Sequence, residues 1–319
     1  MSNYFFEVLR PGINTTFQDK GRFHMQHLGV TPGGCMDLQS FSIANGLVGN
    51  TSDEGVLEFA YQGPLLKLIK GRTKIAITGN VLFQIIKSNR EIINGESNRT
   101  YALDVGDQID ILATKQSAYG YMALEGGFDI KPFCKSVSIL SRAQIGPNEG
   151  KKIRINDKIN IKRNSKNKKN FVTKVLNNNE NTIRVLKGPQ FYYFSKGSQK
   201  NFFSKEYKIS NLTDRMGMRL EGTVMKNIVN TNIRSEGITK GAIQVPADGQ
   251  PIILLTDYPT IGGYPKIANV ISADYHLLAQ KIPGEKILFQ NVELQEAEQL
   301  YKEHLNSISK VIKNIKEIN

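Results

Sequence analysis

Short apolar runs separated by turn residues follow one another from Phe5 to Leu112. They include FFEVLRPG, GVLEFAYQGPLLKLI, TKIAITGN, VLFQIIKS and TYALDVGDQIDIL. Each has the length of a strand, is alternating or β-branched, and ends at residues that favour turns. One stretch differs: LQSFSIANGLVGN places its apolar residues at helical spacing and follows Asp37, a suitable N-cap. A single helix among many strands favours a β-barrel or sandwich over parallel βαβ units.

The second half of the chain loosely repeats this plan. VLRPG near the start has an echo in VLKGP, and VGDQIDIL has a counterpart in PGEKILFQ. Two similar β domains in tandem explain such echoes economically. Near the C-terminus, apolar residues recur at helical spacing with charges between them, which predicts an amphipathic helix that covers a barrel. These residues are Leu294, Ala297, Tyr301, Leu305, Ile308, Ile312 and Ile315.

We therefore predict an all-β protein with few helices, built from two tandem β-barrel domains and a C-terminal amphipathic helix. The expected parts are an N-terminal β-barrel-like domain over 1–150, a basic Asn/Lys-rich connection over 151–183, a C-terminal barrel domain over 184–292 and the helix over 293–319.

The formal net charge of +13 raises the question of a nucleic-acid partner. Between Lys151 and Lys187 there are twelve Lys or Arg residues against Asp157 and Glu180, which gives a local balance of +10. The rest of the chain therefore carries about +3 and is nearly neutral. A nucleic-acid groove needs basic residues interleaved with stacking aromatics on a folded surface. The segment is Asn-rich and poor in aromatics, so a solvated connection is favoured and a nucleic-acid partner is not expected.

The sequence lacks the motifs that several kinds of catalysis and cofactor binding require. It has no GxxxxGK[ST] loop and no CxxC or HExxH motif, and its four histidines show no metal-ligand spacing. We expect no metal site and no attached biotin. Two cysteines in 319 residues favour a reducing compartment, although a disulfide between Cys35 and Cys134 stays possible. Because no apolar run reaches about 20 residues and no export signal is present, a cytoplasmic location is expected.

Charged side chains and glycines gather between Ser210 and Lys266, in SNLTDRMGMRLEG, IRSEGITKGAIQVPADGQPIILLTD and YPTIGGYPK. A charged side chain on a glycine-bounded turn can lie at the rim of a β-structure and still reach a ligand. Ordinary hairpin turns with solvated charges are the alternative, and the density of the set favours a site.

The residue types in this stretch suit a small polar ligand with a carbonyl or carboxylate group. Arg215 and Arg219 offer forked donors for a planar anion, and Lys266 adds a point charge for a developing oxyanion. Acidic residues can accept protons or orient these cations, and they are Asp214, Glu236 and Asp248. An internal salt bridge between Asp214 and Arg215 that closes a hairpin is an equally open possibility.

Seven ordered runs carry a family resemblance over nearly the whole chain. They are PGINTTFQDKGR, GVTPGGCMD, ANGLVGN, LEFAYQGPLL, SNLTDRMGMRLEG, SEGITKGAIQVPADGQPIILLTD and GGYPKIANVI. The sequence resembles the family described as biotin-dependent carboxyltransferase, allophanate hydrolase subunit 2, KipA or the C-type subunit of bacterial 5-oxoprolinase. The resemblance implies cyclophilin-like β-barrels in tandem.

The same resemblance implies an activity that depends on partners. It suggests the C-type subunit of a 5-oxoprolinase, which with a KipI-like partner protein and Mg-ATP phosphorylates 5-oxoproline. A third, LamB/YcsF-like protein would then open the ring to L-glutamate, and this chain alone would be inactive. Two other functions stay open. One is carboxyl transfer to urea or a related amide, as in urea carboxylase. The other is KipA-type regulation, in which binding antagonises a histidine-kinase inhibitor without turnover.

The predicted site combines residue chemistry with the family runs. Predicted catalytic residues are Asp214, Arg215, Glu236 and Lys266, and predicted substrate-binding residues are Arg22, Asp37, Arg219, Gln244, Asp248 and Tyr264. Gln244 and Tyr264 are expected to recognise an amide, whereas Arg22 and Asp37 enter through the resemblance alone. Asp37 also has the alternative role of helix cap. The run over 135–139 departs from the family by lacking an Arg and a Thr, so no inter-domain residue is included.

Overall fold

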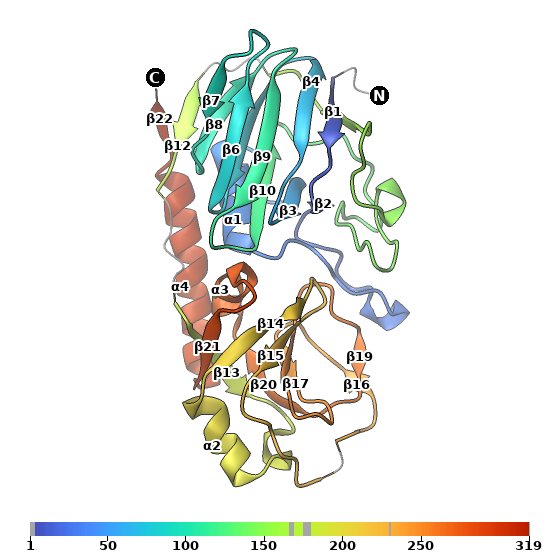
Figure 1. Cartoon of the computed structure of the whole chain (residues 1–319), viewed down its shortest axis with the longest axis vertical. Helices are drawn as coiled ribbons and strands as arrows, with labels where there is room; N and C mark the ends of the chain where they lie inside the picture. Colours follow the sequence, from blue (N-terminus) through green and yellow to red (C-terminus); the bar gives the residue numbers. More distant parts are fainter. Residues whose placement is uncertain (1–3, 166–168, 175–179, 230, 319) are drawn as a thin grey trace. The chain divides into compact units, whose positions relative to one another are not determined.

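The computed structural model describes residues 4–165, 169–174, 180–229 and 231–318 (Figure 1). These residues are mostly β, with four α-helices in the described part of the chain, which confirms the fold class predicted from the sequence. No helix in these ranges is both long enough and apolar enough to cross a membrane.

The chain divides into two compact units that interleave in sequence. Unit 1 comprises Met1–Arg22, Asp37–Leu176 and Ser307–Asn319, and unit 2 comprises Phe23–Met36 and Asn177–Asn306. A glycine-rich loop from the first domain of the sequence prediction thus belongs to unit 2, and the C-terminal residues belong to unit 1.

Unit 1 is built from two open antiparallel sheets around one apolar core. Alternation along the strands turns Val8, Leu66 and Phe83 of one sheet, and Phe59 and Ile75 of the other, into this core. The six-stranded sheet has the order β11-β1-β4-β9-β6-β7 and the seven-stranded sheet has the order β2-β3-β10-β5-β8-β12-β22. Their strands are β1 Phe5–Arg10, β2 Asn14–Gln18, β3 Val56–Ala60, β4 Leu65–Lys70, β5 Thr73–Thr78, β6 Val81–Ile86, β7 Ile92–Asn94, β8 Arg99–Leu103, β9 Gln108–Thr114, β10 Tyr119–Leu124, β11 Lys158–Asn160, β12 Asn170–Val172 and β22 Lys316–Ile318.

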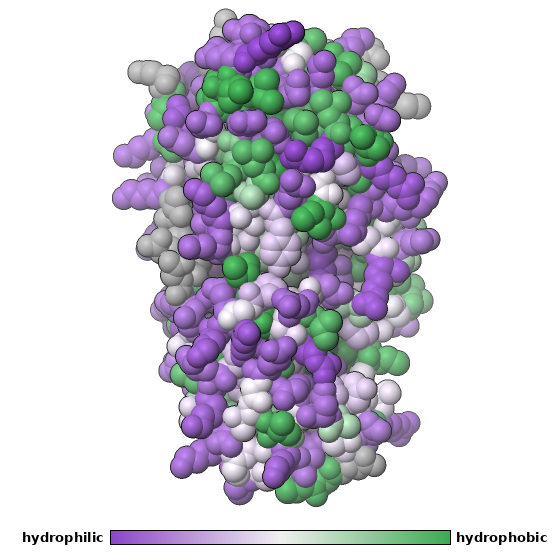
Figure 2. Space-filling model, viewed as in Figure 1, coloured by the Kyte–Doolittle hydropathy of each residue, from purple (hydrophilic) through white to green (hydrophobic). Residues whose placement is uncertain are grey.

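The outer face of the six-stranded sheet exposes several apolar side chains, among them Leu82, Ile92 and Leu112. Figure 2 shows hydrophobic patches over these strands, within a surface that is otherwise mainly hydrophilic.

Helix α1, Leu38–Leu47, belongs to unit 1 and begins at the predicted cap. The Asp37 side chain accepts a hydrogen bond from the Ser40 amide at 3.0 Å, which satisfies one of the donors left open in the first turn. The Ser40 carbonyl accepts from Thr78 Oγ1 at 2.8 Å, and this bond ties the helix to β5.

Unit 2 contains a closed barrel with the strand order β13-β20-β17-β18-β15-β14-β21, in which β13 and β21 are parallel and the other pairs are antiparallel. A separate two-stranded sheet pairs β16 with β19. The strands are β13 Thr182–Lys187, β14 Tyr207–Thr213, β15 Gly217–Glu221, β16 Glu236–Gly237, β17 Ala242–Gln244, β18 Ile252–Leu254, β19 Ile261–Gly262, β20 Lys266–Val270 and β21 Lys286–Asn291. Two helices lie wholly within unit 2, α2 Lys196–Ser204 and α3 Tyr275–Gln280. The 3-10 helices among the described residues are η1 Gln26–Leu28, η2 Asn148–Gly150, η3 Phe191–Tyr193 and η4 Ser272–Asp274.

The predicted amphipathic helix is present as α4, Leu294–Lys313. Ala297, with Leu300 and Tyr301, packs on apolar residues of unit 2 that include Ile271 and Val292. The expected helix extended to 319, but the chain forms strand β22 at Lys316–Ile318 instead.

The basic run expected to be a solvated connection contains two strands of unit 1. Strand β11 pairs with β1, and β12 pairs with β8 and β22. Residues 166–168 and 175–179 of this run lie outside the described residues.

Candidate functional site

One row of side chains crosses four neighbouring strands of the barrel in unit 2. Lys266 on β20 pairs with Gln244 on β17, which pairs with Ile252 on β18, and Ile252 pairs with Arg219 on β15. Residues directly opposite each other in a sheet point to the same face. Ile253, the neighbour of Ile252, is fully buried on the opposite face. Three predicted site residues from distant parts of the sequence are therefore brought into one row.

A β-bulge places Lys266 in this row. The register shifts between Ile243 and Gln244, so that Ile243 pairs with Ala268 while Gln244 pairs with Lys266. The extra residue opposite this step is Ile267, which is fully buried. Bulges of this kind re-aim a side chain without ending the strand.

The ammonium group of Lys266 forms an ion pair with the carboxylate of Glu236. The Lys266 side chain is 8% exposed and the Glu236 side chain is 44% exposed, so a buried cation meets an accessible anion. The hydrogen bond from Lys266 lowers the pKa of Glu236 below its ordinary value of 4.5. A carboxylate with a lowered pKa is a weak base, so Glu236 is better suited to orient Lys266 than to take up a proton.

Gln190 supports both members of this pair. Its amide nitrogen donates to Glu236 Oε1 at 2.8 Å, and its amide oxygen accepts from the backbone N–H of Lys266 at 3.1 Å. The segment that carries Gln190 runs close to β20 because it includes Gly188, where a Cβ atom would lie 2.3 Å from the Lys266 carbonyl oxygen. Gln190 was not among the predicted site residues, and the preceding Gly188-Pro189 turn was the available signal.

Gln244 lies beside Lys266 and is 6% exposed. Its amide nitrogen is buried and has no hydrogen-bond partner within the described part of the chain. Gly262, on the small sheet beside it, allows this position, because a Cβ atom there would lie 2.5 Å from the Gln244 nitrogen. Buried side-chain donors are normally paired, so an unpaired amide next to a cation makes this part of the row a candidate binding position.

Arg215 occupies a second cluster of unit 2. It donates to both carboxylate oxygens of Asp257, from Nε at 2.8 Å and from Nη2 at 2.9 Å, and Nη2 also donates to the Gly34 carbonyl at 2.7 Å. The two side chains of the pair are 7% and 10% exposed. Arg215 therefore fixes the loop that contains Gly34, a residue with a φ of +97°. Asp257 was not predicted, although it lies inside one of the family runs.

Two tyrosines and a glutamine surround the Arg215 cluster. Gln26 Nε2 donates to the Tyr258 hydroxyl at 2.8 Å, and the Tyr275 hydroxyl donates to the Leu254 carbonyl at 2.9 Å. Burial raises the pKa of both tyrosines, that of Tyr275 well above its ordinary value of 10.0. The ammonium group of Lys240 lies 3.7 Å from the centre of the Tyr275 ring, a cation–π contact. Both phenols are therefore neutral hydrogen-bonding groups at neutral pH.

The other predicted residues of unit 2 are more exposed. Arg219 pairs with Asp248, and these side chains are 32% and 45% exposed. Asp214 accepts hydrogen bonds from the backbone N–H groups of Met216, at 2.8 Å, and Gly217, at 3.2 Å. This contact shapes the turn between β14 and β15. Tyr264 is 40% exposed.

Arg22 and Asp37 belong to unit 1. Arg22 is 1% exposed and donates to the Ser138 carbonyl. Asp37 is fully buried, caps α1 and also accepts from the Ser40 hydroxyl at 2.6 Å. The alternative role of Asp37 as a helix cap is thus confirmed by the geometry.

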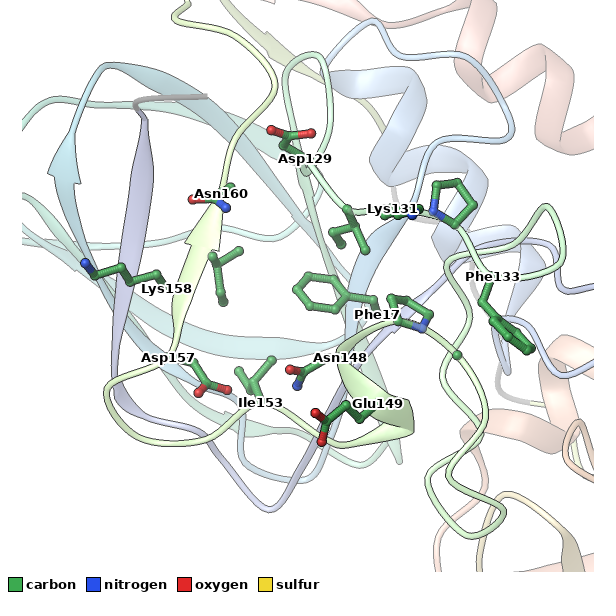
Figure 3. Close-up of a pocket in the computed structure, with 15 residues that line it drawn as sticks. Phe17, Asp129, Lys131, Phe133, Asn148, Glu149, Ile153, Asp157, Lys158 and Asn160 are labelled. Carbon is green, nitrogen blue, oxygen red and sulfur yellow. The ribbon is translucent and has the colours of Figure 1, made fainter. Parts of the chain in front are cut away.

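A pocket of about 580 Å³ lies in unit 1 (Figure 3). Phe17, Ile153 and Ile159 form part of its lining, and its polar groups come from residues such as Asp157 and Asn148. None of the ten predicted site residues lines this pocket.

Comparison with known proteins places the chain in a family. The family model described as "Carboxyltransferase domain, subdomain A and B" matches residues 28–291, and the chain belongs to this family. It is 31% identical over 298 residues to the C-type subunit of 5-oxoprolinase from Escherichia coli (strain K12), covering 91% of this chain and 92% of that protein. It is 30% identical to the C-type subunit of 5-oxoprolinase from Haemophilus influenzae, covering 96% and 98%.

A solved structure shares the fold over almost the whole chain. The crystal structure of the K. lactis urea amidolyase aligns with a TM-score of 0.87 at 26% identity and covers 98% of this chain. The aligned part is 20% of the urea amidolyase chain.

Proposed function

We propose that this chain is the C-type subunit of an ATP-dependent 5-oxoprolinase, which acts with a KipI-like partner protein to activate 5-oxoproline. Support comes from two relatives named as the C-type subunit of 5-oxoprolinase, each aligned over more than nine tenths of both chains. The geometric observation that carries the proposal is the adjacent pair formed by the buried Lys266 ammonium and the unpartnered Gln244 amide.

These two donors suit the carbonyl group of a lactam. In the proposed activation, the lactam carbonyl oxygen forms a bond to the γ-phosphorus of ATP while the bond from that phosphorus to ADP breaks. The ring nitrogen then loses its proton to water. The Lys266 ammonium group would stabilise the negative charge of the carbonyl oxygen and of the phosphoryl group during the transfer. The Gln244 amide would donate a hydrogen bond to the lactam, which an apolar ring cannot accept. Hydrolysis of the activated ring to L-glutamate and phosphate is assigned to a LamB/YcsF-like protein.

The other predicted residues have supporting roles in this proposal. Glu236 orients Lys266, and Arg215 holds the Gly34 loop through the contacts described above. Arg219 and Tyr264 are accessible on unit 2 and are proposed to contact the carboxylate of the substrate. The exposed carboxylates Asp214 and Asp248 are proposed to contact the KipI-like partner.

The test is ATP consumption with 5-oxoproline, measured on this chain co-purified with its KipI-like partner, with and without the LamB/YcsF-like protein. We expect turnover that requires 5-oxoproline and is lost in Lys266→Met. Lys70→Met, which alters an exposed lysine of unit 1, is the control and should retain activity. A stable complex that consumes no ATP in response to 5-oxoproline would exclude the proposal and favour a KipA-type regulatory role.

Carboxyl transfer to urea or a related amide is the second candidate, favoured by the likeness to urea amidolyase and by the family itself. The same pair of donors would then bind the urea oxygen. This function predicts that a separately supplied carboxybiotin carrier loses its carboxyl group faster when both urea and this chain are present. No acceleration by the chain would reject it.

A further inference from the structure

A second pocket in unit 1, of about 370 Å³, is lined mainly by cationic side chains. Its lining consists of Ser141, Arg142, Gln144, Lys151, Lys152 and Arg154. Four of these six residues are positively charged, two are neutral hydrogen-bonding residues, and no carboxylate is among them. We call it the basic pocket. It lies outside the row of unit 2 on which the proposed function rests.

One side of the basic pocket is a tight turn. Leu140 and Ile145 exchange two backbone hydrogen bonds, of 2.8 and 3.2 Å, and close the loop that contains Ser141, Arg142 and Gln144. Gln144 has a φ of +53°, a left-handed conformation that is uncommon for a residue with a side chain. The two hydrogen bonds therefore fix the backbone of the turn from which the side chains of Arg142 and Gln144 project.

The other side is an extended segment in which side chains alternate. Ile153 is 4% exposed, belongs to the core of unit 1 and donates from its backbone to the Thr15 carbonyl at 3.3 Å. Because neighbouring residues of an extended chain point to opposite sides, Lys152 and Arg154 are directed away from that core. Both are exposed and line the basic pocket.

Gly150 allows the two sides of the basic pocket to approach each other closely. It has a φ of +69°, and a Cβ atom at this position would lie 2.1 Å from the Gln144 carbonyl carbon and 2.4 Å from the Ile145 nitrogen. The two backbones therefore approach as closely as glycine allows, and the cations of both sides are kept near one another despite their repulsion.

Glu149, which belongs to the neighbouring pocket, neutralises part of the positive charge of the basic pocket. Its carboxylate pairs with Lys151, and the hydrogen bond to Lys151, together with a smaller contribution from Arg154, lowers the pKa of Glu149. Glu149 lines the pocket of Figure 3 rather than the basic pocket. Its side chain is exposed, so the contact is one that a stronger anion in the basic pocket can replace.

We propose that the basic pocket binds the phosphoryl groups of a small phosphorylated ligand. The exposed Lys152 and Arg154 offer an ammonium group and a guanidinium group, beside the positive charges of Arg142 and Lys151. Such a set matches an anion of two or more charges better than a single carboxylate, and Arg forks fit phosphate oxygens. The Ser141 hydroxyl and Gln144 amide supply neutral donors. The ligand is either a free phosphate species, such as inorganic triphosphate, or the phosphate tail of a nucleotide. This inference goes beyond the proposed function, because binding at this pocket does not require 5-oxoproline turnover.

The experiment measures binding by calorimetry with the full-length chain at about 0.15 M salt, where weak surface attraction is largely screened. The probes are inorganic triphosphate, ATP and adenosine. The test variant is the double substitution Lys152→Ala and Arg154→Ala. The control is Lys70→Ala with Lys115→Ala, which removes the same charge from exposed positions elsewhere in unit 1. A third variant, Glu149→Gln, removes the competing carboxylate.

We expect the test variant to weaken triphosphate binding at least tenfold, the control to change it less than twofold and Glu149→Gln to strengthen it several-fold. Thermal unfolding should be unchanged in the test variant, because both altered side chains are exposed. ATP binding equal to or tighter than triphosphate, and lost in the test variant, would identify a nucleotide as a ligand, whereas ATP binding weaker than triphosphate would identify a free phosphate species. No triphosphate binding at millimolar concentration, or equal losses in the test and control variants, would overturn the proposal.

Discussion

The Lys266 ammonium group and the Glu236 carboxylate form an ion pair whose two members differ in exposure, at 8% and 44%. Lys266 belongs to barrel strand β20, whereas Glu236 belongs to the small sheet formed by β16 and β19. Lys266 is the more buried member, so it is the group that needs a counter-ion most. Removing Glu236 should therefore lower the free energy of unfolding by more than removing Lys266.

Substitution of either partner should show this asymmetry. Lys266→Met leaves an accessible carboxylate, so we expect a loss of at most about 1 kcal/mol in the free energy of unfolding. Glu236→Gln leaves a buried ammonium group without its counter-ion, and about 1–3 kcal/mol should be lost. Activity should rank the variants differently: Lys266→Met should lower 5-oxoproline-dependent ATP turnover about 100-fold.

Urea unfolding of both variants, with turnover assayed in the complex with the KipI-like partner, tests this prediction. Equal stability losses would show that the burial of Lys266 has no energetic consequence. Full turnover in Lys266→Met would remove this residue from the site.

The lowered pKa of Glu236 gives a pH dependence with a definite sign. In the unfolded chain this carboxyl group titrates near its ordinary value of 4.5, and in the folded protein it titrates below that value. The ion pair therefore contributes its full stabilisation above about pH 4.5 and loses it as the pH falls through the lower, folded pKa.

Unfolding measured from pH 7 down to pH 3 should show this loss. Glu236→Gln, which cannot titrate, should reduce the part of the stability decrease that occurs below pH 4.5. Identical pH profiles for the wild type and the variant would mean that the pair does not influence stability.

Gly262 can be tested against a glycine of the same small sheet. In Gly262→Ala the new methyl group would lie 2.5 Å from the Gln244 amide nitrogen, so the flexible amide must move. We expect a rise of about fivefold in KM for 5-oxoproline, since each misplaced hydrogen bond costs roughly 1 kcal/mol, with little change in Tm. Gly237→Ala is the matched control, because a Cβ atom there meets nothing within 4 Å.

Steady-state kinetics of the two glycine variants separates the effects. If Gly237→Ala raises KM as much as Gly262→Ala, the higher KM arises from a general disturbance of the small sheet. The Gln244 amide would then not be a specific contact of 5-oxoproline.

Local sequence patterns were sufficient for much of the fold. Alternating apolar runs predicted the strands, and the position of Asp37 before a helical run predicted the cap of α1. Tandem echoes predicted two β units, but not their interleaving, because the exchange of Phe23–Met36 into unit 2 depends on long-range packing. The β22 strand was missed for the same reason: it exists through pairing with β12, more than 140 residues away.

For the candidate site, local sequence features predicted several of the residues but not how they are arranged. Residue type and glycine density selected Lys266, Glu236 and Gln244 as candidates. Their arrangement depends on the bulge between Ile243 and Gln244, which no local pattern of the sequence reveals. Asp257, the partner of Arg215, was missed because the pair joins residues 42 positions apart.

The Arg215–Asp257 pair should be far more important for stability than the Arg219–Asp248 pair. Arg215→Ala would leave the Asp257 carboxylate, 10% exposed, without its two charge-assisted hydrogen bonds, and would remove the hydrogen bond from Nη2 to the Gly34 carbonyl. Breaking a buried pair in this way costs about 3–5 kcal/mol. Arg219→Ala removes the same charge from a pair whose side chains are 32% and 45% exposed, where about 0–1 kcal/mol is expected.

Chemical unfolding of the two arginine variants measures this difference, and the double variant Arg215→Met, Asp257→Leu tests its cause. If the loss in Arg215→Ala arises from the unpaired carboxylate, replacing both partners by apolar residues should recover part of the stability, although the hydrogen bond to the Gly34 carbonyl is still missing. A double variant as unstable as Arg215→Ala would instead assign the loss to the missing hydrogen bond to Gly34. Equal stability of Arg215→Ala and Arg219→Ala would contradict the burial of the Arg215 pair.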